Sequence, residues 1–261
     1  MSRIANAFNH GKAFIGFVTG GDPSVEKSEE FILQMIKAGA DLIEIGIPFS
    51  DPIAEGPVIQ EANIRALNAG ASVEKMFDIV KSVRTKSDVP LVFLTYYNPV
   101  FKYGEDAFFK KCASCGLDGI IIPDMPFEES EDLRKCALGH GIDLISIIAP
   151  TSEQRITEIA RNASGFIYIV SSMGVTGMRN KIETDLSKIV AMVKKASKVP
   201  AAVGFGINTP KQAADIAAIA DGVIVGSAIV KIAAQYGKDA GSHIFDYVKN
   251  MKEAISTIRT D

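Results

Sequence analysis

The sequence contains three cysteines and no tryptophan. Three cysteines are too few for the disulfide framework of a small secreted protein, and they fit a reducing compartment. Cys112 and Cys115 form a C-x-x-C pair in the helical stretch 106–115, but Cys136 belongs to a different predicted helix. No cysteine or histidine completes a zinc ligand set around the pair, so we interpret all three residues as structural thiols and expect no metal.

The sequence also lacks long apolar runs and a strong excess of either charge. Its 28 basic and 31 acidic residues give a net charge of -3, which disfavours a nucleic-acid or anionic-membrane surface. No segment approaches the roughly 18 to 20 apolar residues of a membrane span. The apolar stretch 13–18 is too short for a signal peptide and has no cleavage site. We therefore expect a cytoplasmic protein.

One pattern recurs along the 261 residues: a β-branched apolar run, a polar loop, and then an amphipathic helix. Continuous apolar runs are typical of parallel strands covered by helices. The predicted strands are Ala13–Thr19, Leu42–Ile47, Pro90–Tyr96, Gly119–Ile122, Leu144–Ile148, Phe166–Val170, Ala201–Gly204 and Gly222–Val225. Eight such units favour an α/β fold of the (β/α)₈ TIM-barrel type, formed by residues 1–261 as a single domain with a short N-terminal helix at 2–9. An open doubly wound sheet is the alternative, because strand order cannot be read from one sequence.

Helical periodicity fills the segments between these strands. The predicted helices include 25–38, 73–85, 128–138, 153–162, 186–196 and 210–219. Residues that commonly cap helix N-termini precede several of them, namely Ser24, Ser72, Ser152, Asp185 and Thr209.

The loops that follow strands form the active face of such barrels. Gly204-Phe205-Gly206 follows the seventh predicted strand, and Gly226-Ser227 follows the eighth and opens a helix. Barrels often bind phosphate here through backbone N–H groups, although the glycines could simply make tight turns. The small, glycine-rich loop 171–180 after the sixth strand could close over a substrate, or it could be a disordered connection.

Carboxylates gather after the second strand. Glu44 lies inside the apolar run 42–47, where burial would raise its pKa and make it a usable proton donor, or where an ion pair could hold it. Asp51 and Glu55 follow in a proline-rich loop and could complete an acid/base pair. Aromatic residues at strand ends could line a flat pocket, or each could belong to the core. These aromatic residues are Phe17, Tyr96, Tyr168 and Phe205.

Five motifs resemble those of the tryptophan synthase alpha subunit family, in family order and spacing across nearly the whole chain. They are FVTGGDPS (17–24), IEIGIPFSDPIAEGPVIQ (43–60), IIPDMPFEES (121–130), GVTGMR (174–179), and GFGI (204–207) with GSAIV (226–230). The resemblance implies a lyase that performs retro-aldol cleavage of indole-3-glycerol phosphate to indole and glyceraldehyde 3-phosphate in tryptophan biosynthesis.

The resemblance also implies roles for individual residues. Glu44 would protonate indole C3 and then help to remove a proton from the glycerol hydroxyl. Glu55, where better-known members usually have Asp, would interact with the indole N–H. Tyr168 would lie near Glu44, and Thr176 would hydrogen-bond Glu55 when loop 171–180 closes. The residues expected at the indole are Phe17, Tyr96, Ile121, Ile147 and Phe205, and those expected at the phosphate are Gly177, Gly206, Gly226 and Ser227.

The resemblance further implies a beta-subunit partner, normally in an α₂β₂ heterotetramer. The pyridoxal phosphate cofactor belongs to that partner, so no cofactor is expected in this chain. Three alternatives stay open: a sugar-phosphate isomerase of amino-acid biosynthesis, a non-catalytic regulatory subunit, and a stand-alone indole-releasing lyase. The isomerase gives no account of Glu44 and Glu55 together.

Overall fold

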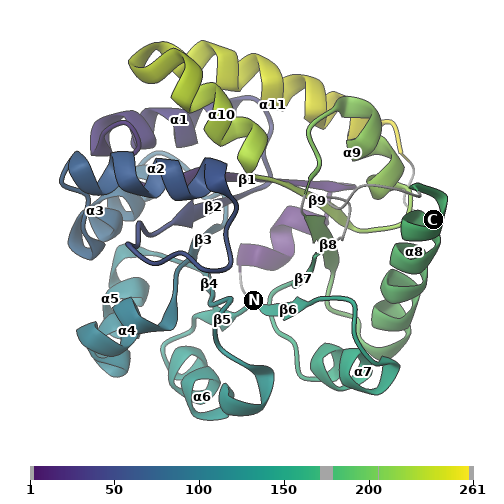
Figure 1. The fold of residues 1–261 in the computed structure, drawn as a ribbon. Coiled ribbons are helices and arrows are strands. Elements are labelled where there is room, and N and C mark those ends of the chain that lie inside the picture. Colours follow the sequence, from purple (N-terminus) through teal and green to yellow (C-terminus); the bar gives the residue numbers. More distant parts are fainter. Residues whose placement is uncertain (1–2, 171–178, 205, 259–261) are drawn as a thin grey trace.

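The described residues form a ring of parallel strands surrounded by helices (Figure 1). The structure is a computed structural model that describes residues 3–170, 179–204 and 206–258, with the side chains of 179–185 left out. The strand order is β5-β4-β3-β2-β1-β9-β8-β7-β6. The strands are β1 Ala13–Thr19, β2 Leu42–Gly46, β3 Leu91–Leu94, β4 Gly119–Ile121, β5 Asp143–Leu144, β6 Ser146–Ile148, β7 Ile167–Val170, β8 Ala201–Gly204 and β9 Gly222–Val225.

The two ends of the sheet belong to one stretch of chain. β5 pairs with β4, with Gly119 opposite Asp143, and β6 pairs with β7, with Ser146 opposite Ile167. Only Ile145 separates β5 from β6, so the fifth predicted strand is present but interrupted at that residue. Because this one stretch joins both edges, the sheet is a barrel, and the open doubly wound alternative is wrong.

The barrel interior is filled by one apolar side chain from each of the eight predicted strand segments, and two of these side chains, Ile145 and Phe166, lie just outside the observed strands. Alternation along the strands directs this set inward, while the intervening residues pack against the helices. The inward set is Ile15, Leu42, Val92, Ile121, Ile145, Phe166, Ala202 and Ile224. The short helix η1 (Arg3–Phe8) adds Ile4 and Ala7 to this interior cluster and covers the end at which the strands begin. The opposite end stays available for the loops that follow the strands.

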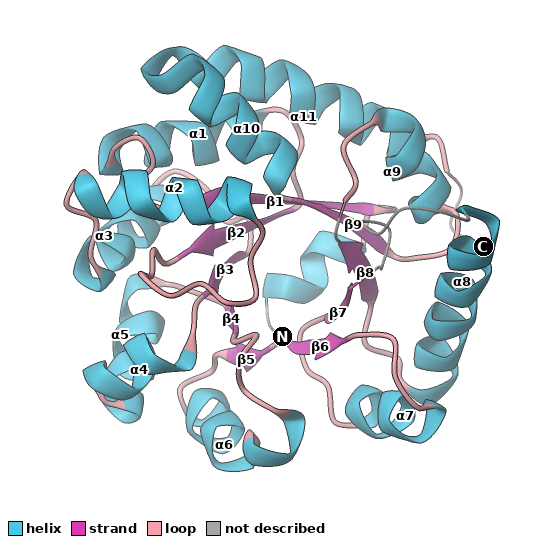
Figure 2. Cartoon of the chain, viewed as in Figure 1, coloured by secondary structure: helices cyan, strands magenta, loops and turns pink. Residues whose placement is uncertain are grey.

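Helices form the outer layer (Figure 2). The described helices are η1, α1 Val25–Lys37, α2 Pro57–Asn68, α3 Val73–Arg84, α4 Tyr97–Tyr103, α5 Glu105–Cys115, η2 Phe127–Glu129, α6 Glu131–Gly139, α7 Glu153–Arg161, α8 Arg179–Ala196, α9 Pro210–Ala217, α10 Ser227–Tyr236, η3 Gly237–Asp239 and α11 Ala240–Ser256. Among the described residues, no helix is long and apolar enough to cross a membrane.

Four of the five predicted N-caps are confirmed, because Ser24, Ser72, Ser152 and Thr209 each accept a backbone N–H from the first helical turn. The assignment of Asp185 as a cap is wrong, since α8 begins at Arg179 and residue 185 lies inside it. Residues that favour caps also occur within helices, so residue type alone did not locate this start.

The predicted helix 128–138 is divided in the structure. A 3₁₀ turn, η2, comes first, and α6 begins only at Glu131. The Ser130 hydroxyl donates to the Phe127 carbonyl at 2.7 Å, which closes the turn locally before α6 starts.

Candidate active site

Glu44 faces the barrel interior from the middle of β2. It has the same strand parity as inward Leu42, and it lies opposite Phe17 of β1 and Val92 of β3. Its side chain is 1% exposed, and within the described residues its Oε1 has no hydrogen-bond partner and its carboxyl makes no ion pair. Burial raises the pKa of Glu44 to about 8. The ion-paired alternative therefore finds no support in the described part of the chain, and the carboxyl is mostly protonated at neutral pH.

Tyr168 lies across the barrel on β7, half-buried and inside the same interior cluster. Burial raises its pKa well above the ordinary value, and the nearby charge of Glu44 raises it further. A Cβ on Gly204 would come within 2.5 Å of the Tyr168 hydroxyl, so the glycine in β8 leaves the space that this side chain occupies. Glu44 and Tyr168 are therefore close enough inside the barrel for the charge of Glu44 to affect the pKa of the Tyr168 hydroxyl.

Glu55 is held at the end of the loop between β2 and α2. Its Oε2 accepts a 2.7 Å hydrogen bond from Asn63 Nδ2, and Gln60 Nε2 donates to its backbone carbonyl at 2.8 Å. Burial raises the pKa of Glu55 to about 6, while the Asn63 hydrogen bond acts in the opposite direction. The two predicted acids thus have different proton affinities, with Glu55 mainly ionised at neutral pH and Glu44 mainly neutral.

Asn63 is a site residue that the sequence interpretation missed. It is 4% exposed on α2, and its Oδ1 also accepts from the Phe49 N–H at 3.3 Å, so it joins both ends of the loop. A polar residue on the buried face of a helix was the available signal. Asp51, the other candidate acid of this loop, is exposed and accepts a hydrogen bond from the neighbouring Ser50 hydroxyl.

Tyr96, predicted at the indole, contacts the same loop. The Ala54 N–H donates to its hydroxyl at 2.9 Å, and its ring centroid lies 5.2 Å from that of Phe49. Burial raises the pKa of Tyr96 to about 12, which keeps the hydroxyl neutral as an acceptor. The structure therefore shows Tyr96 supporting the loop that carries Glu55.

An apolar patch connects the acids with the glycine-rich end of the site. Phe17 contacts Gly46 closely enough that a Cβ there would come within 2.7 Å of its ring, and its ring also lies beside Gly226. Phe17 clusters with Ala62 of α2, Val230 of α10 and Leu94 of β3, none of which was predicted as a site residue. Among the other predicted contacts, Ile121 is buried and Ile147 half-buried, both within the interior cluster.

A second loop fixes α2 over the barrel. Asp22, which follows β1, accepts two hydrogen bonds from Arg65 of α2, at 2.9 and 2.8 Å. In Figure 1, α2 and α10 lie over the barrel end nearest the viewer, which is the end where the strands finish. This bidentate ion pair was also missed, because its partners are 43 residues apart in the sequence.

The ends of β8 and β9 place the predicted phosphate ligands in neighbouring loops. The first N–H groups of any helix lack an intrahelical acceptor, and Gly226, which precedes α10, offers no side chain to cap them. Ser227 is exposed beside these N–H groups, which can bind an anion. Gly206 has a φ of +79°, a conformation that favours glycine. Three predicted residues, Thr176, Gly177 and Phe205, lie outside the described residues, as does most of loop 171–180.

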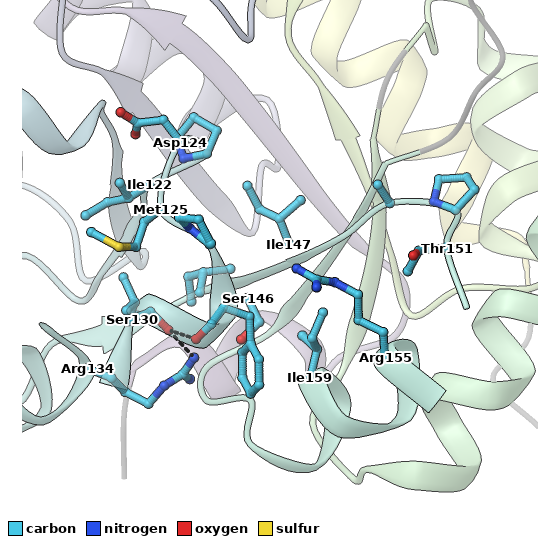
Figure 3. A pocket seen from close by; sticks show the side chains of 17 residues that line it. Ile122, Asp124, Met125, Ser130, Arg134, Ser146, Ile147, Thr151, Arg155 and Ile159 are labelled. Atoms are coloured by element: carbon cyan, nitrogen blue, oxygen red, sulfur yellow. Dashed lines mark hydrogen bonds between the residues drawn. The ribbon is translucent and has the colours of Figure 1, made fainter. Parts of the chain in front are cut away.

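A cavity of about 510 Å³ lies beside this site, between α6 and α7 (Figure 3). Ser146 and Ile147 of β6 lie between Arg134 of α6 and Arg155 of α7 in this view. Of the predicted site residues that the structure describes, Ile147 alone borders the cavity. The cavity thus meets the predicted site only at Ile147 and does not contain the acid pair.

Known proteins are similar to this chain over nearly its whole length. Residues 4–257 match the model of the family described as tryptophan synthase alpha chain. The chain is 48% identical to the tryptophan synthase alpha chain of Lacticaseibacillus casei over 98% of this chain and 96% of that protein. Its fold matches the crystal structure of tryptophan synthase subunit alpha from Legionella pneumophila with a TM-score of 0.90 and 35% identity, covering 99% and 100% of the two chains. It also matches a chain of a tryptophan synthase complex from Pyrococcus furiosus with a TM-score of 0.85 and 32% identity, covering 93% and 99%.

Proposed function

This chain belongs to the tryptophan synthase alpha chain family, the lyases that cleave indole-3-glycerol phosphate in tryptophan biosynthesis, and from that premise we propose which of its residues perform the cleavage. The observation that carries the proposal is Glu44, a buried carboxyl inside the barrel without a hydrogen-bond partner for Oε1 among the described residues, whose pKa is raised to about 8. A sugar-phosphate isomerase has no support from this family membership.

Glu44 is the proton carrier. Because it is mostly protonated at neutral pH, it donates its proton to C3 of the indole ring, which makes the ring an electron acceptor. The resulting carboxylate accepts the proton of the glycerol hydroxyl next to the breaking bond. The carbon–carbon electron pair then passes into the ring, which leaves as indole, and the hydroxyl carbon becomes the aldehyde of glyceraldehyde 3-phosphate. Tyr168 positions Glu44 from across the barrel.

Glu55 is the fixed negative charge of the reaction. With its pKa raised only to about 6, it stays mostly ionised and accepts a hydrogen bond from the indole N–H, where positive charge develops when C3 is protonated. Asn63 holds the carboxylate in place, and Tyr96 supports the loop behind it.

The remaining contacts bind the two ends of the substrate. Phe17, Ile121 and Ile147 supply apolar surface for the indole ring from inside the barrel. The N–H groups at the start of α10, with Ser227 and the backbone of Gly206, bind the phosphate without a basic side chain. Thr176, Gly177 and Phe205 keep their predicted roles within this proposal.

A beta subunit is the partner of this chain. The related Pyrococcus furiosus structure is a tryptophan synthase complex, and the family resemblance implies an α₂β₂ assembly. The indole would pass to that partner, so full activity depends on the complex.

The test is indole release from indole-3-glycerol phosphate by the purified chain, alone and after addition of a tryptophan synthase beta subunit. We expect slow release by the chain alone and a marked increase with the partner. Fast release without a partner would identify a stand-alone lyase and reject the partner proposal. No release in either condition would reject the catalytic assignments and favour a regulatory subunit.

A further inference from the structure

One group of three metal-ligating side chains comes together within the described residues, away from the barrel mouth. It consists of Asp106 in the first turn of α5, and Cys136 and His140 at the end of α6. Their ligand atoms all lie within 4.8 Å of one another, and His140 Nε2 lies 2.8 Å from Asp106 Oδ1. None of these residues belongs to the acid pair, the apolar patch or the phosphate-binding loops.

The spacing of the group follows from helix geometry. Cys136 and His140 are four residues apart and therefore lie on the same face of α6, one turn from each other. α5 packs against α6 and brings Asp106 to that face from a different part of the chain. The C-x-x-C pattern in the sequence involves the other two cysteines. In the structure, Cys112 and Cys115 are buried and point into the core, whereas Cys136 is only half-buried.

The chemistry of the group suits a cation of intermediate softness. A thiolate, an imidazole and a carboxylate are common zinc ligands, at about 2.0 to 2.3 Å from the metal. Ligand atoms of such a site lie about 3 to 4 Å apart, so the present separations need only side-chain rotation. The carboxylates of Asp106 and Glu105 both act on the Cys136 thiol electrostatically, so the field at the sulfur is negative and favours a cation.

The geometry points to a zinc site formed by Asp106, Cys136 and His140, which clips α5 to α6 and leaves one coordination position for water. On binding, the Cys136 thiol releases its proton to solvent and forms the Zn–S bond. His140 takes the tautomer with its proton on Nδ1, so that its neutral Nε2 and the Asp106 carboxylate both bind the metal in place of their 2.8 Å hydrogen bond. Asp106 is mostly exposed, so it turns toward the metal at little cost in packing. The site ties two neighbouring helices of the outer layer together, and its effect is on stability and not on the cleavage reaction.

The test is a zinc titration of the reduced full-length chain, followed by calorimetry, together with a cobalt titration followed by absorbance. We expect one equivalent of zinc to bind and to raise Tm, and we expect cobalt to give a thiolate-to-metal charge-transfer band. Cys136→Ser, His140→Ala and Asp106→Asn should each weaken zinc binding by at least about tenfold, since even changes outside the ligand shell cost about 10- to 100-fold. Cys136→Ser should also abolish the cobalt band.

Matched controls separate this site from nonspecific binding. His10→Ala removes an exposed histidine elsewhere, and Asp132→Asn removes an exposed aspartate from α6 itself, so both should bind zinc like the wild-type chain. Indole release should be unchanged in all five variants and confirms that each is folded. No saturable zinc binding by the wild-type chain, or equal binding by the three ligand variants, would overturn the proposal.

Discussion

Two glutamates in the same β-strand–loop–helix unit differ in burial, in hydrogen bonding and in proton affinity. Glu44 lies within a buried strand, and its Oε1 has no hydrogen-bond partner among the described residues. Glu55 lies on a loop, and its carboxylate accepts a hydrogen bond from Asn63. Burial raises the pKa of both, to about 8 in the strand and only to about 6 in the loop. The comparison shows that the surroundings of a glutamate, and not its residue type, decide whether it acts as a proton donor or as a fixed anion.

The largest effect is expected from removal of the titrating group in the strand. Glu44→Gln keeps the shape of the side chain but carries no transferable proton, so kcat should fall by about 10²- to 10⁴-fold. Binding of a phosphate-bearing product should persist, and calorimetry with glyceraldehyde 3-phosphate would show this. Glu61→Gln, an exposed glutamate on α2, is the matched control. Near-normal turnover by Glu44→Gln would reject Glu44 as the proton carrier.

The same substitution should stabilise the fold at high pH. Burial raises the folded-state pKa of Glu44 to about 8 from its ordinary value of 4.5, so the folded chain binds the proton more tightly than the unfolded chain. Stability is therefore fully present below about pH 4.5 and is lost as the pH rises toward about 8. Glu44→Gln avoids this loss and should gain a few kcal/mol in the free energy of unfolding at pH 9, but little at pH 4.5. Urea denaturation at both pH values measures this free energy. An equal effect of the substitution at pH 4.5 and pH 9 would show that the pKa of Glu44 is not raised in the folded chain.

A substitution at the predicted phosphate site should weaken substrate binding without changing the pKa of Glu44 or of Glu55. Gly206→Val forces a side chain into a backbone with a φ of +79° and displaces the N–H that we place at the phosphate. Loss of one charge-assisted hydrogen bond should raise KM by about 10- to 100-fold. The pH limits of kcat should stay unchanged. An unchanged KM would argue against phosphate binding at Gly206.

The loop glutamate should respond to its hydrogen-bond partner. Asn63→Ala removes the bond that lowers the pKa of Glu55, so the acid limit of kcat/KM should move to higher pH by about one unit. Activity should therefore fall at pH 6.5 more than at pH 8. Gln60→Ala is the control, because Gln60 bonds only the backbone carbonyl of Glu55. A shift of the same size in both variants would mean that loop distortion, and not the carboxylate's hydrogen bond, sets the limit.

The smallest effect is expected from shortening the loop glutamate. Glu55→Asp matches the residue usual in better-known family members, and the loop can absorb one methylene by a small movement. We expect kcat/KM within about tenfold of the wild-type value, since larger losses follow misplacement of about 1 Å. Total loss of activity would show that this loop is built around the longer side chain.

Much of this architecture could be predicted locally. Continuous apolar runs identified all eight barrel segments, and Ser24, Ser72, Ser152 and Thr209 marked helix starts. Both signals depend on neighbours in the sequence, namely strand periodicity and hydrogen bonds within one helical turn. Where local signals were ambiguous, the predictions failed, as at Asp185 and at the start of α6.

The sequence by itself determined the barrel segments, the acidic residues and the glycine-rich loops, because these depend on residue type and spacing along the chain. Only the tertiary structure decided the proton affinities of Glu44 and Glu55, the support of the loop by Asn63 and Tyr96, and the meeting of Asp106 with Cys136 and His140. These properties depend on how much water is excluded around a carboxyl and on contacts between distant segments. Desolvation and long-range contact exist only once the chain has closed into a barrel.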